Sequence, residues 1–131
     1  GQHGLIADTV DIGVARWWNG SFLSTGATER GIGSGRTNTR KIVAVQGEGS
    51  YAAYLCATYK GSGCKDWFLP SKDELSQLFK QKQVVGGFAE CCYWSSTEVI
   101  NEEAWDQFFT DGSRENEYKA NESNVRAVRS F

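Results

Sequence analysis

The chain has 131 residues, a net charge of −2 and 13% aromatic residues, with fifteen glycines and a single proline. A chain of this length and composition fits one loop-rich but ordered domain, and it buries enough surface to form an aromatic core without a metal or heavy cross-linking. No run of about 18 apolar residues occurs, which excludes a membrane-spanning helix. We expect a single globular domain over residues 1–131, in which residues 1–4 are the remnant of a tag or of a stalk.

The N-terminal part predicts a strand followed by a long loop. Residues 5–14 alternate loosely between apolar and polar side chains and precede Trp17-Trp18-Asn19-Gly20, a pattern typical of an opening strand and a turn. If the two tryptophans lie in a strand, one of them faces outward and is available to a ligand or to an oligomer interface. Residues 20–35 are rich in Gly, Ser and Thr, and we expect a loop there.

A helical region follows this loop. Asn38 or Thr39 is expected to cap a helix, and apolar or small residues then recur at three- and four-residue steps over residues 42–56. Two glycines interrupt this stripe. The sequence therefore predicts one kinked helix or two short helices between Thr39 and Thr58.

The clearest helix signal begins at Ser71. Ser71 and Glu74 have the spacing of a capping box, in which each side chain bonds the backbone amide of the other residue. We predict a helix over residues 71–81, preceded by Pro70. Its buried face is expected to consist of Leu75, Leu78 and Phe79.

The C-terminal part predicts mainly strands. They are expected near residues 92–97, 104–110, 117–120 and 124–130, and Asp111-Gly112 indicates a hairpin between two of them. Together with the helices, this order predicts an α+β fold with a mostly antiparallel sheet, two main helices and long loops. The residues expected in its core are Trp67, Trp94, Trp105, Phe108 and Phe131.

The four cysteines allow more than one interpretation. Cys56 ends the predicted helical region and Cys64 follows a Gly-Ser-Gly turn, so the chain can return, and we predict a Cys56–Cys64 disulfide. Cys91 and Cys92 are then free or form a strained vicinal pair. Alternatively, the cysteines are buried thiols that act as small hydrophobic side chains. An even count in a small, loop-rich domain favours an oxidising compartment.

Several chemical motifs fail on inspection. Gly31-Ile32-Gly33-Ser34-Gly35-Arg36 resembles a nucleotide-binding loop, but Arg36 stands where the third glycine belongs and Ile32 stands where a P-loop requires Lys. The only histidine is His3 and no Cys-x-x-Cys occurs, so we expect neither a metal site nor a His-dependent triad, and no cofactor. A carboxylate dyad stays open, because acidic residues are plentiful.

Charge is unevenly distributed along the chain. Residues 30–46 contain four basic residues and no acid, whereas residues 98–122 contain eight acids and two basic residues. One interpretation is two ordinary solvated faces. The other is a basic patch for an anionic polymer, with the acidic face kept away from it.

Four motifs of the C-terminal half are distinctive: Trp67-Phe68-Leu69-Pro70-Ser71-Lys72-Asp73-Glu74-Leu75, Tyr93-Trp94-Ser95-Ser96-Thr97-Glu98, Ala104-Trp105-Asp106-Gln107-Phe108-Phe109 and Val125-Arg126-Ala127-Val128-Arg129-Ser130-Phe131. In these motifs the chain resembles the C-terminal domain family of the Legionella collagen-like adhesin. The resemblance covers residues 33–131 in the same order. It implies a C-type-lectin-like fold on a secreted or bacterial cell-surface protein, a homotrimer at the end of a collagen-like stalk, and binding of sulfated glycosaminoglycans. The Glu-Pro-Asn or Gln-Pro-Asp tripeptide of calcium-dependent lectins is absent.

We therefore expect a non-enzymatic adhesion module, with no nucleic-acid partner and no membrane span. Guanidinium groups match sulfate with paired hydrogen bonds, so basic side chains are the expected ligands. Two alternatives stay open: a carboxylate-dependent hydrolase and a purely structural trimerisation cap. The predicted ligand-binding residues are Arg30, Arg36, Arg40, Lys41, Lys80 and Lys82.

Within this set, the group from Arg30 to Lys41 is favoured. Arg36 and Arg40 lie four residues apart at the expected helix start, so they share a face. Lys72 is less favoured, because two acidic residues follow it. We also expect Arg126 or Arg129 to pair with an acid inside the fold, because the two face opposite sides of a strand.

Overall fold

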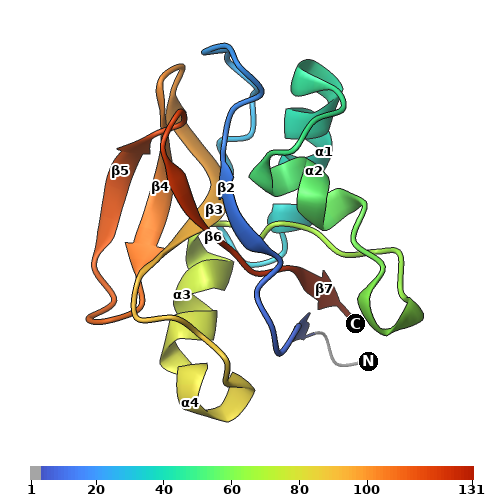
Figure 1. The fold of residues 1–131 in the computed structure, drawn as a ribbon, viewed down its shortest axis with the longest axis vertical. Coiled ribbons are helices and arrows are strands. Elements are labelled where there is room, and N and C mark those ends of the chain that lie inside the picture. Colours follow the sequence, from blue (N-terminus) through green and yellow to red (C-terminus); the bar gives the residue numbers. More distant parts are fainter. Residues whose placement is uncertain (1–3) are drawn as a thin grey trace.

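Seven strands and four α-helices make up residues 4–131, which are the residues that the computed structural model describes (Figure 1). The helices are α1 (Gly35–Gln46), α2 (Ala52–Ala57), α3 (Lys72–Lys80) and α4 (Lys82–Val85), and a short 3-10 turn covers Gly61–Gly63. The strands are β1 (Leu5–Ala7), β2 (Gly13–Arg16), β3 (Cys92–Ile100), β4 (Glu103–Phe108), β5 (Arg114–Tyr118), β6 (Glu122–Val125) and β7 (Val128–Ser130).

The strands form two sheets that are mostly antiparallel. The larger has the order β2-β6-β3-β4-β5, in which only β3 and β6 run parallel, and the smaller pairs β1 with β7. A hairpin joins β4 to β5 as predicted, with Gly112 at a φ of +82°, a value that favours glycine. The fold is therefore α+β, as the sequence predicts.

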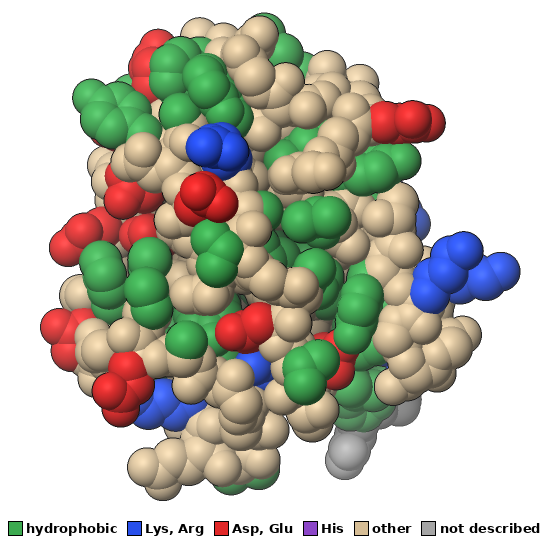
Figure 2. Space-filling view, viewed as in Figure 1, with side chains coloured by type: hydrophobic (Ala, Val, Ile, Leu, Met, Phe, Trp, Pro, Cys, Tyr) green, Lys and Arg blue, Asp and Glu red, His purple; other side chains and the backbone are tan. Residues whose placement is uncertain are grey.

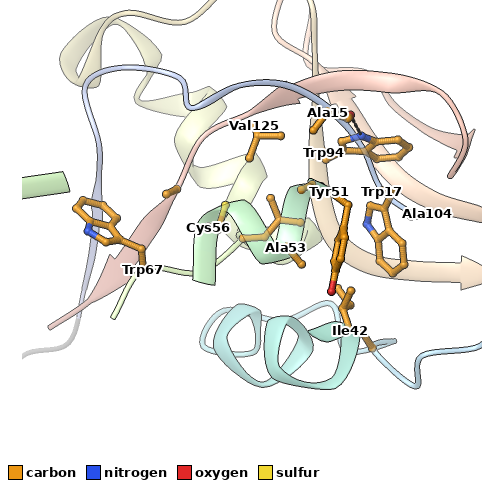
Figure 3. Close-up of a cluster of buried hydrophobic side chains, with 14 residues drawn as sticks. Ala15, Trp17, Ile42, Tyr51, Ala53, Cys56, Trp67, Trp94, Ala104 and Val125 are labelled. Atoms are coloured by element: carbon orange, nitrogen blue, oxygen red, sulfur yellow. Dashed lines mark hydrogen bonds between the residues drawn. The ribbon is translucent and has the colours of Figure 1, made fainter. Parts of the chain in front are cut away.

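Two hydrophobic clusters lie on opposite faces of the larger sheet. Consecutive residues of a strand point to opposite sides, so Trp94 joins one cluster and Tyr93 the other. Trp94 packs with Trp17 and Tyr51 on the side of the sheet that α1 and α2 cover, and its indole nitrogen donates to the Ala15 carbonyl at 2.9 Å (Figure 3). Tyr93 packs with Phe109 and the apolar face of α3.

The helical region consists of two short helices, one of the two predicted alternatives. However, α1 begins at Gly35 after Ser34, so the predicted cap at Asn38 or Thr39 is wrong. Both side chains are buried instead. The Asn38 amide donates to the Glu29 carbonyl at 2.7 Å, and the Thr39 hydroxyl accepts from the Leu69 amide at 3.0 Å.

Helix α3 confirms the predicted capping box. The Glu74 carboxylate accepts from the Ser71 amide at 2.9 Å, and the Ser71 hydroxyl accepts from the Glu74 amide at 3.3 Å. The same carboxylate also accepts from the amides of Gly33 and Gly35, at 2.9 and 3.1 Å. One buried side chain thus caps α3 and holds the loop that leads into α1.

The predicted core is only partly correct. Trp67 and Trp94 are buried, whereas the side chains of Trp105 and Phe108 are half-buried. Phe131 is 62% exposed and lies just beyond β7, at the end of the β1–β7 pair. The prediction missed Phe109, which packs fully into the cluster beneath α3.

Two predicted strand boundaries near the C-terminus need correction, whereas the expected acidic partner of Arg126 or Arg129 is confirmed. The predicted strand over residues 124–130 is divided into β6 and β7, which belong to different sheets. The side chain of Arg126, between them, is buried and pairs with Asp11 at 2.8 Å, while Arg129 pairs with Asp66, so both arginines have acidic partners. Strand β5 begins at Arg114, three residues before the predicted residues 117–120.

All four cysteines are free, so the predicted Cys56–Cys64 disulfide is wrong. Cys56 lies on the core face of α2 with no exposed surface, and burial raises the pKa of its thiol. The Cys64 thiol contacts the carbonyl of Ser62 at 3.7 Å. Cys56 therefore acts as a small hydrophobic side chain, which is the alternative interpretation.

The first and last described residues, Gly4 and Phe131, lie close together. Gly4 and Phe131 exchange two backbone hydrogen bonds, which extend the β1–β7 pair by one residue. The rest of the expected tag or stalk remnant, residues 1–3, lies outside the described residues. Within residues 4–131 no helix is long and apolar enough to cross a membrane.

Candidate functional site

The six predicted binding residues do not form one surface. Arg36 and Arg40 share a face of α1, as their spacing predicts, and both line a cavity of about 500 Å³ beside this helix. Lys65 lines the same cavity from the segment that follows α2. We refer to this cavity, with Arg36, Arg40 and Lys65, as the α1 cleft.

The inner wall of the α1 cleft is aromatic. Trp67 and Phe68 line it, with 5% and 3% of their residue surfaces exposed. The Arg36 guanidinium lies 5.7 Å from the centre of the Phe68 ring and donates to the Ser130 hydroxyl at 2.9 Å. These contacts fix the Arg36 head group at the wall of the cleft.

The α1 cleft contains one acidic side chain, and that carboxylate already has a partner. Asp66 accepts two hydrogen bonds from Arg129, at 2.7 and 3.1 Å. These bonds hold the pKa of Asp66 below its usual value. Among the described residues, neither Arg40 nor Lys65 forms an ion pair. Both charges are available to a ligand.

A second group of basic residues surrounds Trp105. The Lys72 ammonium lies 3.6 Å from the centre of the Trp105 ring, and the Arg30 guanidinium lies 5.9 Å from it. Burial lowers the pKa of Lys72, and repulsion from Arg114 and Arg30 lowers it further. We refer to Arg30, Lys72 and Arg114 as the Trp105 cluster.

The sequence did not indicate the Trp105 cluster. Lys72 was disfavoured because two acids follow it, but Glu74 is buried and bonds the loop before α1. Of these two acids, only Asp73 lies at the surface, and its carboxylate lies 3.9 Å from the Arg114 guanidinium. No spacing rule links Lys72 to Trp105, which reaches it from β4.

The remaining predicted residues are dispersed. The Lys41 ammonium points to the Gly26 carbonyl at 3.4 Å, on the side of α1 away from the cleft. The Lys82 ammonium donates to the Phe109 carbonyl at 2.7 Å and so fixes α4 against the end of β4. Lys80 is exposed and lines a cavity of about 260 Å³ with Asp73 and Arg114. Lys80 and Lys82 therefore do not form a common site.

A third cavity lies beside the paired termini. It has a volume of about 750 Å³ and is mainly apolar, with Leu5, Ile32 and Phe131 in its wall and Arg36 at its edge. Ile32 and Phe131 are more than half exposed. Arg36 thus separates this apolar cavity from the α1 cleft.

The buried carboxylates have structural partners, with one exception. Glu98 accepts from Lys119 at 2.6 Å and from the Thr25 amide at 3.0 Å. The Asp106 carboxylate has one oxygen without a hydrogen bond, and burial, with repulsion from Glu117 and Glu115, raises its pKa to about 7.

A carboxylate-dependent hydrolase needs two acidic side chains close together, and the described residues place no such pair at the three cavities. Among the described residues, each cavity is lined by one acid at most, Asp66 in the α1 cleft and Asp73 in the smallest cavity. Nor does any group of three or more metal-binding side chains occur among these residues. The geometry of the α1 cleft is suited to binding an anion.

Comparison with known proteins does not identify this arrangement. No protein-family model matches the chain, and no curated protein matches it either.

Proposed function

We propose that the chain is a non-enzymatic adhesion module that binds sulfated polysaccharide in the α1 cleft. The observation that carries this proposal is the concave, aromatic-walled cleft in which Arg40 and Lys65 have no acidic partner among residues 4–131 and Asp66 is paired with Arg129. Sulfate is a fixed anion, and a guanidinium matches its oxygens with paired hydrogen bonds.

The family resemblance supports the same function. The motif of residues 67–75 covers the cap and first turn of α3, and that of residues 93–98 lies in the central strand β3, so both belong to the structural frame of the domain. On this basis we also propose a C-type-lectin-like domain that belongs to a secreted or bacterial cell-surface protein. The α+β fold with α1 and α3 as its two longest helices is consistent with that assignment.

Trimer formation would compensate for a weak single site. Three or four basic residues give modest affinity at physiological salt, because ions screen exposed charges beyond about 8 Å. Three clefts in one assembly raise the effective concentration of binding groups without new contacts. This part of the proposal rests on the family resemblance. The Trp17–Trp18 pair does not support a trimer separately, because Trp17 is buried and Trp18 packs on Phe22 with a ring-centre distance of 4.6 Å.

Retention on immobilised heparin across a salt gradient tests the function. The wild-type domain is compared with Arg36→Ala/Arg40→Ala and with Lys80→Ala/Lys82→Ala, which removes the same number of charges. We expect the first variant to elute at clearly lower salt and the second to elute close to wild type. Equal losses would show that binding does not depend on the α1 cleft in particular, and no retention of the folded wild-type domain would refute polyanion binding.

The structural trimerisation cap is the second candidate. Light scattering in the same buffer separates it from the adhesion module. A stable trimer with no heparin retention would favour the cap. A protein that is monomeric at tens of micromolar and still binds heparin would support the α1 cleft and contradict the trimer.

A further inference from the structure

The thiols of Cys91 and Cys92 lie 3.5 Å apart, although the residues are neighbours in the chain. Neighbouring residues within a regular strand point to opposite faces, which would separate their side chains. Cys92 is the first residue of β3, however, and Cys91 lies in the bend before it. This bend turns both sulfur atoms to the same side.

The two thiols differ in access to solvent. Cys91 is exposed, whereas Cys92 is half-buried and accepts a hydrogen bond from the Ser123 hydroxyl at 3.5 Å. Burial raises the pKa of the Cys92 thiol, and the neighbouring Cys91 and the nearby Asp106 raise it further. A solute therefore reaches Cys91 first and finds a second thiol in contact with it.

We propose that Cys91 and Cys92 form a reversible dithiol–disulfide site that reacts with small-molecule disulfides of the glutathione class. The Cys91 thiolate attacks one sulfur of the oxidant, forming a mixed disulfide and releasing one thiolate, which takes up a proton. The Cys92 thiolate then attacks the Cys91 sulfur and displaces the second thiolate. Two protein thiols and one disulfide thus become one protein disulfide and two small thiols.

The product is expected to be labile. The Cα atoms of neighbouring residues are about 3.8 Å apart across a trans peptide, below the range of about 4.4–6.8 Å that unstrained disulfides span. Strained disulfides are reduced more readily, so a small thiol in excess reopens the bond.

Oxidation is also expected to loosen the start of β3. The Cys91 carbonyl accepts from the Phe109 amide at 2.8 Å, and the Cys92 carbonyl accepts from the Asn124 side chain at 3.1 Å. Closing a ring between neighbouring residues rotates the peptide between them, which carries the Cys91 carbonyl. The Phe109 amide should therefore exchange its hydrogen faster in the oxidised protein. This inference does not depend on polysaccharide binding.

Peptide mapping tests the proposal directly. Trypsin cleaves after Lys82 and Arg114, so residues 83–114 form one peptide that contains Cys91 and Cys92 but neither Cys56 nor Cys64. After the reduced full chain is treated with glutathione disulfide, we expect this peptide to lose two hydrogens in mass and to carry no glutathione. Cys92→Ser should trap a stable glutathione adduct at Cys91, and Cys91→Ser should react far more slowly.

A stable adduct on the wild-type peptide, or a disulfide that joins it to the Cys64 peptide, would overturn the proposal. Phenylarsine oxide provides a second measurement that needs no disulfide ring. Two thiols in contact replace its oxygen with two arsenic–sulfur bonds and release one water. We expect one equivalent bound to wild type and none retained by either serine variant, and equal binding by Cys91→Ser would contradict a paired site.

Discussion

Charged side chains play opposite parts in the long loop and in the α1 cleft. Beneath the loop over residues 20–34, the buried carboxylates of Glu98 and Glu74 accept backbone hydrogen bonds and hold an irregular segment in place. In the α1 cleft, Arg40 and Lys65 are exposed and form no ion pair with a described residue. Buried charges stabilise the fold, whereas exposed charges stay available to a ligand.

This difference explains how a chain of net charge −2 can offer a site for a polyanion. Three acids, Glu74, Glu98 and Asp106, are buried inside the fold, and several of the others lie on the strands β4 and β5. On the face shown in Figure 2, acidic side chains gather along the edge where β5 runs. The α1 cleft is formed by other elements, so its basic residues face few acids. Local charge, rather than net charge, decides what this domain attracts.

The largest effect is expected where a buried charge loses its partner. Lys119→Met leaves Glu98 without its ammonium partner, and breaking a buried pair in this way costs about 3–5 kcal/mol. Urea unfolding should show a correspondingly lower midpoint. Adding Glu98→Gln should recover part of the loss, because the double variant buries no uncompensated charge. A single variant as stable as wild type would contradict the structural role of this pair.

The next effect depends on pH. The pKa of Asp106 is about 7 in the folded protein, whereas an unfolded carboxyl ionises near pH 4. Between these values the unfolded state has released its proton and the folded state has kept it, so stability falls as pH rises, by roughly 3–4 kcal/mol in total. Asp106→Asn should abolish this fall, and the exposed Glu90→Gln should not. Parallel stability–pH curves for wild type and Asp106→Asn would refute the assignment.

A smaller effect is expected at the loop that Glu74 holds. Glu74→Gln removes the charge from hydrogen bonds to Gly33, Gly35 and Ser71, and its amide group turns one acceptor into a donor. We expect a loss of about 2 kcal/mol, with faster hydrogen exchange at the Gly33 and Gly35 amides. Asp73→Asn, in the same helical turn but half-exposed, is the matched control. Equal effects of the two variants would show that Glu74 acts only as a helix charge.

The smallest effect on stability is expected in the α1 cleft itself. Arg40→Gln/Lys65→Gln removes two exposed charges that have no acidic partner among the described residues. The free energy of unfolding, measured by thermal denaturation, should therefore change by less than about 0.5 kcal/mol. Heparin retention should nevertheless fall. A double variant that unfolds several degrees lower would place these residues with the structural charges instead.

Local signals in the sequence predict part of this fold well. The Ser71–Glu74 spacing predicts α3, and the Arg36–Arg40 spacing predicts their shared face, because both depend on residues within one helical turn. The start of α1 is mispredicted because the capping rule also considers only residues close together in the sequence. Asn38 resembles a cap, but its amide bonds a carbonyl nine residues earlier in the chain, which no local rule can anticipate.

The binding site shows the same limit. Lys65 reaches the α1 cleft from the segment after α2, and Lys72, at the start of α3, lies over the Trp105 ring from β4. Each contact depends on how the elements pack. Composition indicates that basic residues cluster between residues 30 and 46, but only packing divides them between the cleft, the Trp105 cluster and the Gly26 carbonyl.

The indole signals of the tryptophans test the central claim most directly. A proton–nitrogen NMR titration with a sulfated heparin oligosaccharide reports on all five of them separately. If the α1 cleft binds the oligosaccharide, the indole signal of Trp67, which lines the cleft, shifts progressively, while those of Trp17 and Trp94, which do not line it, stay in place. A shift confined to Trp105 would assign binding to the Trp105 cluster and contradict the cleft, and no shift at any tryptophan would contradict polyanion binding at both surfaces.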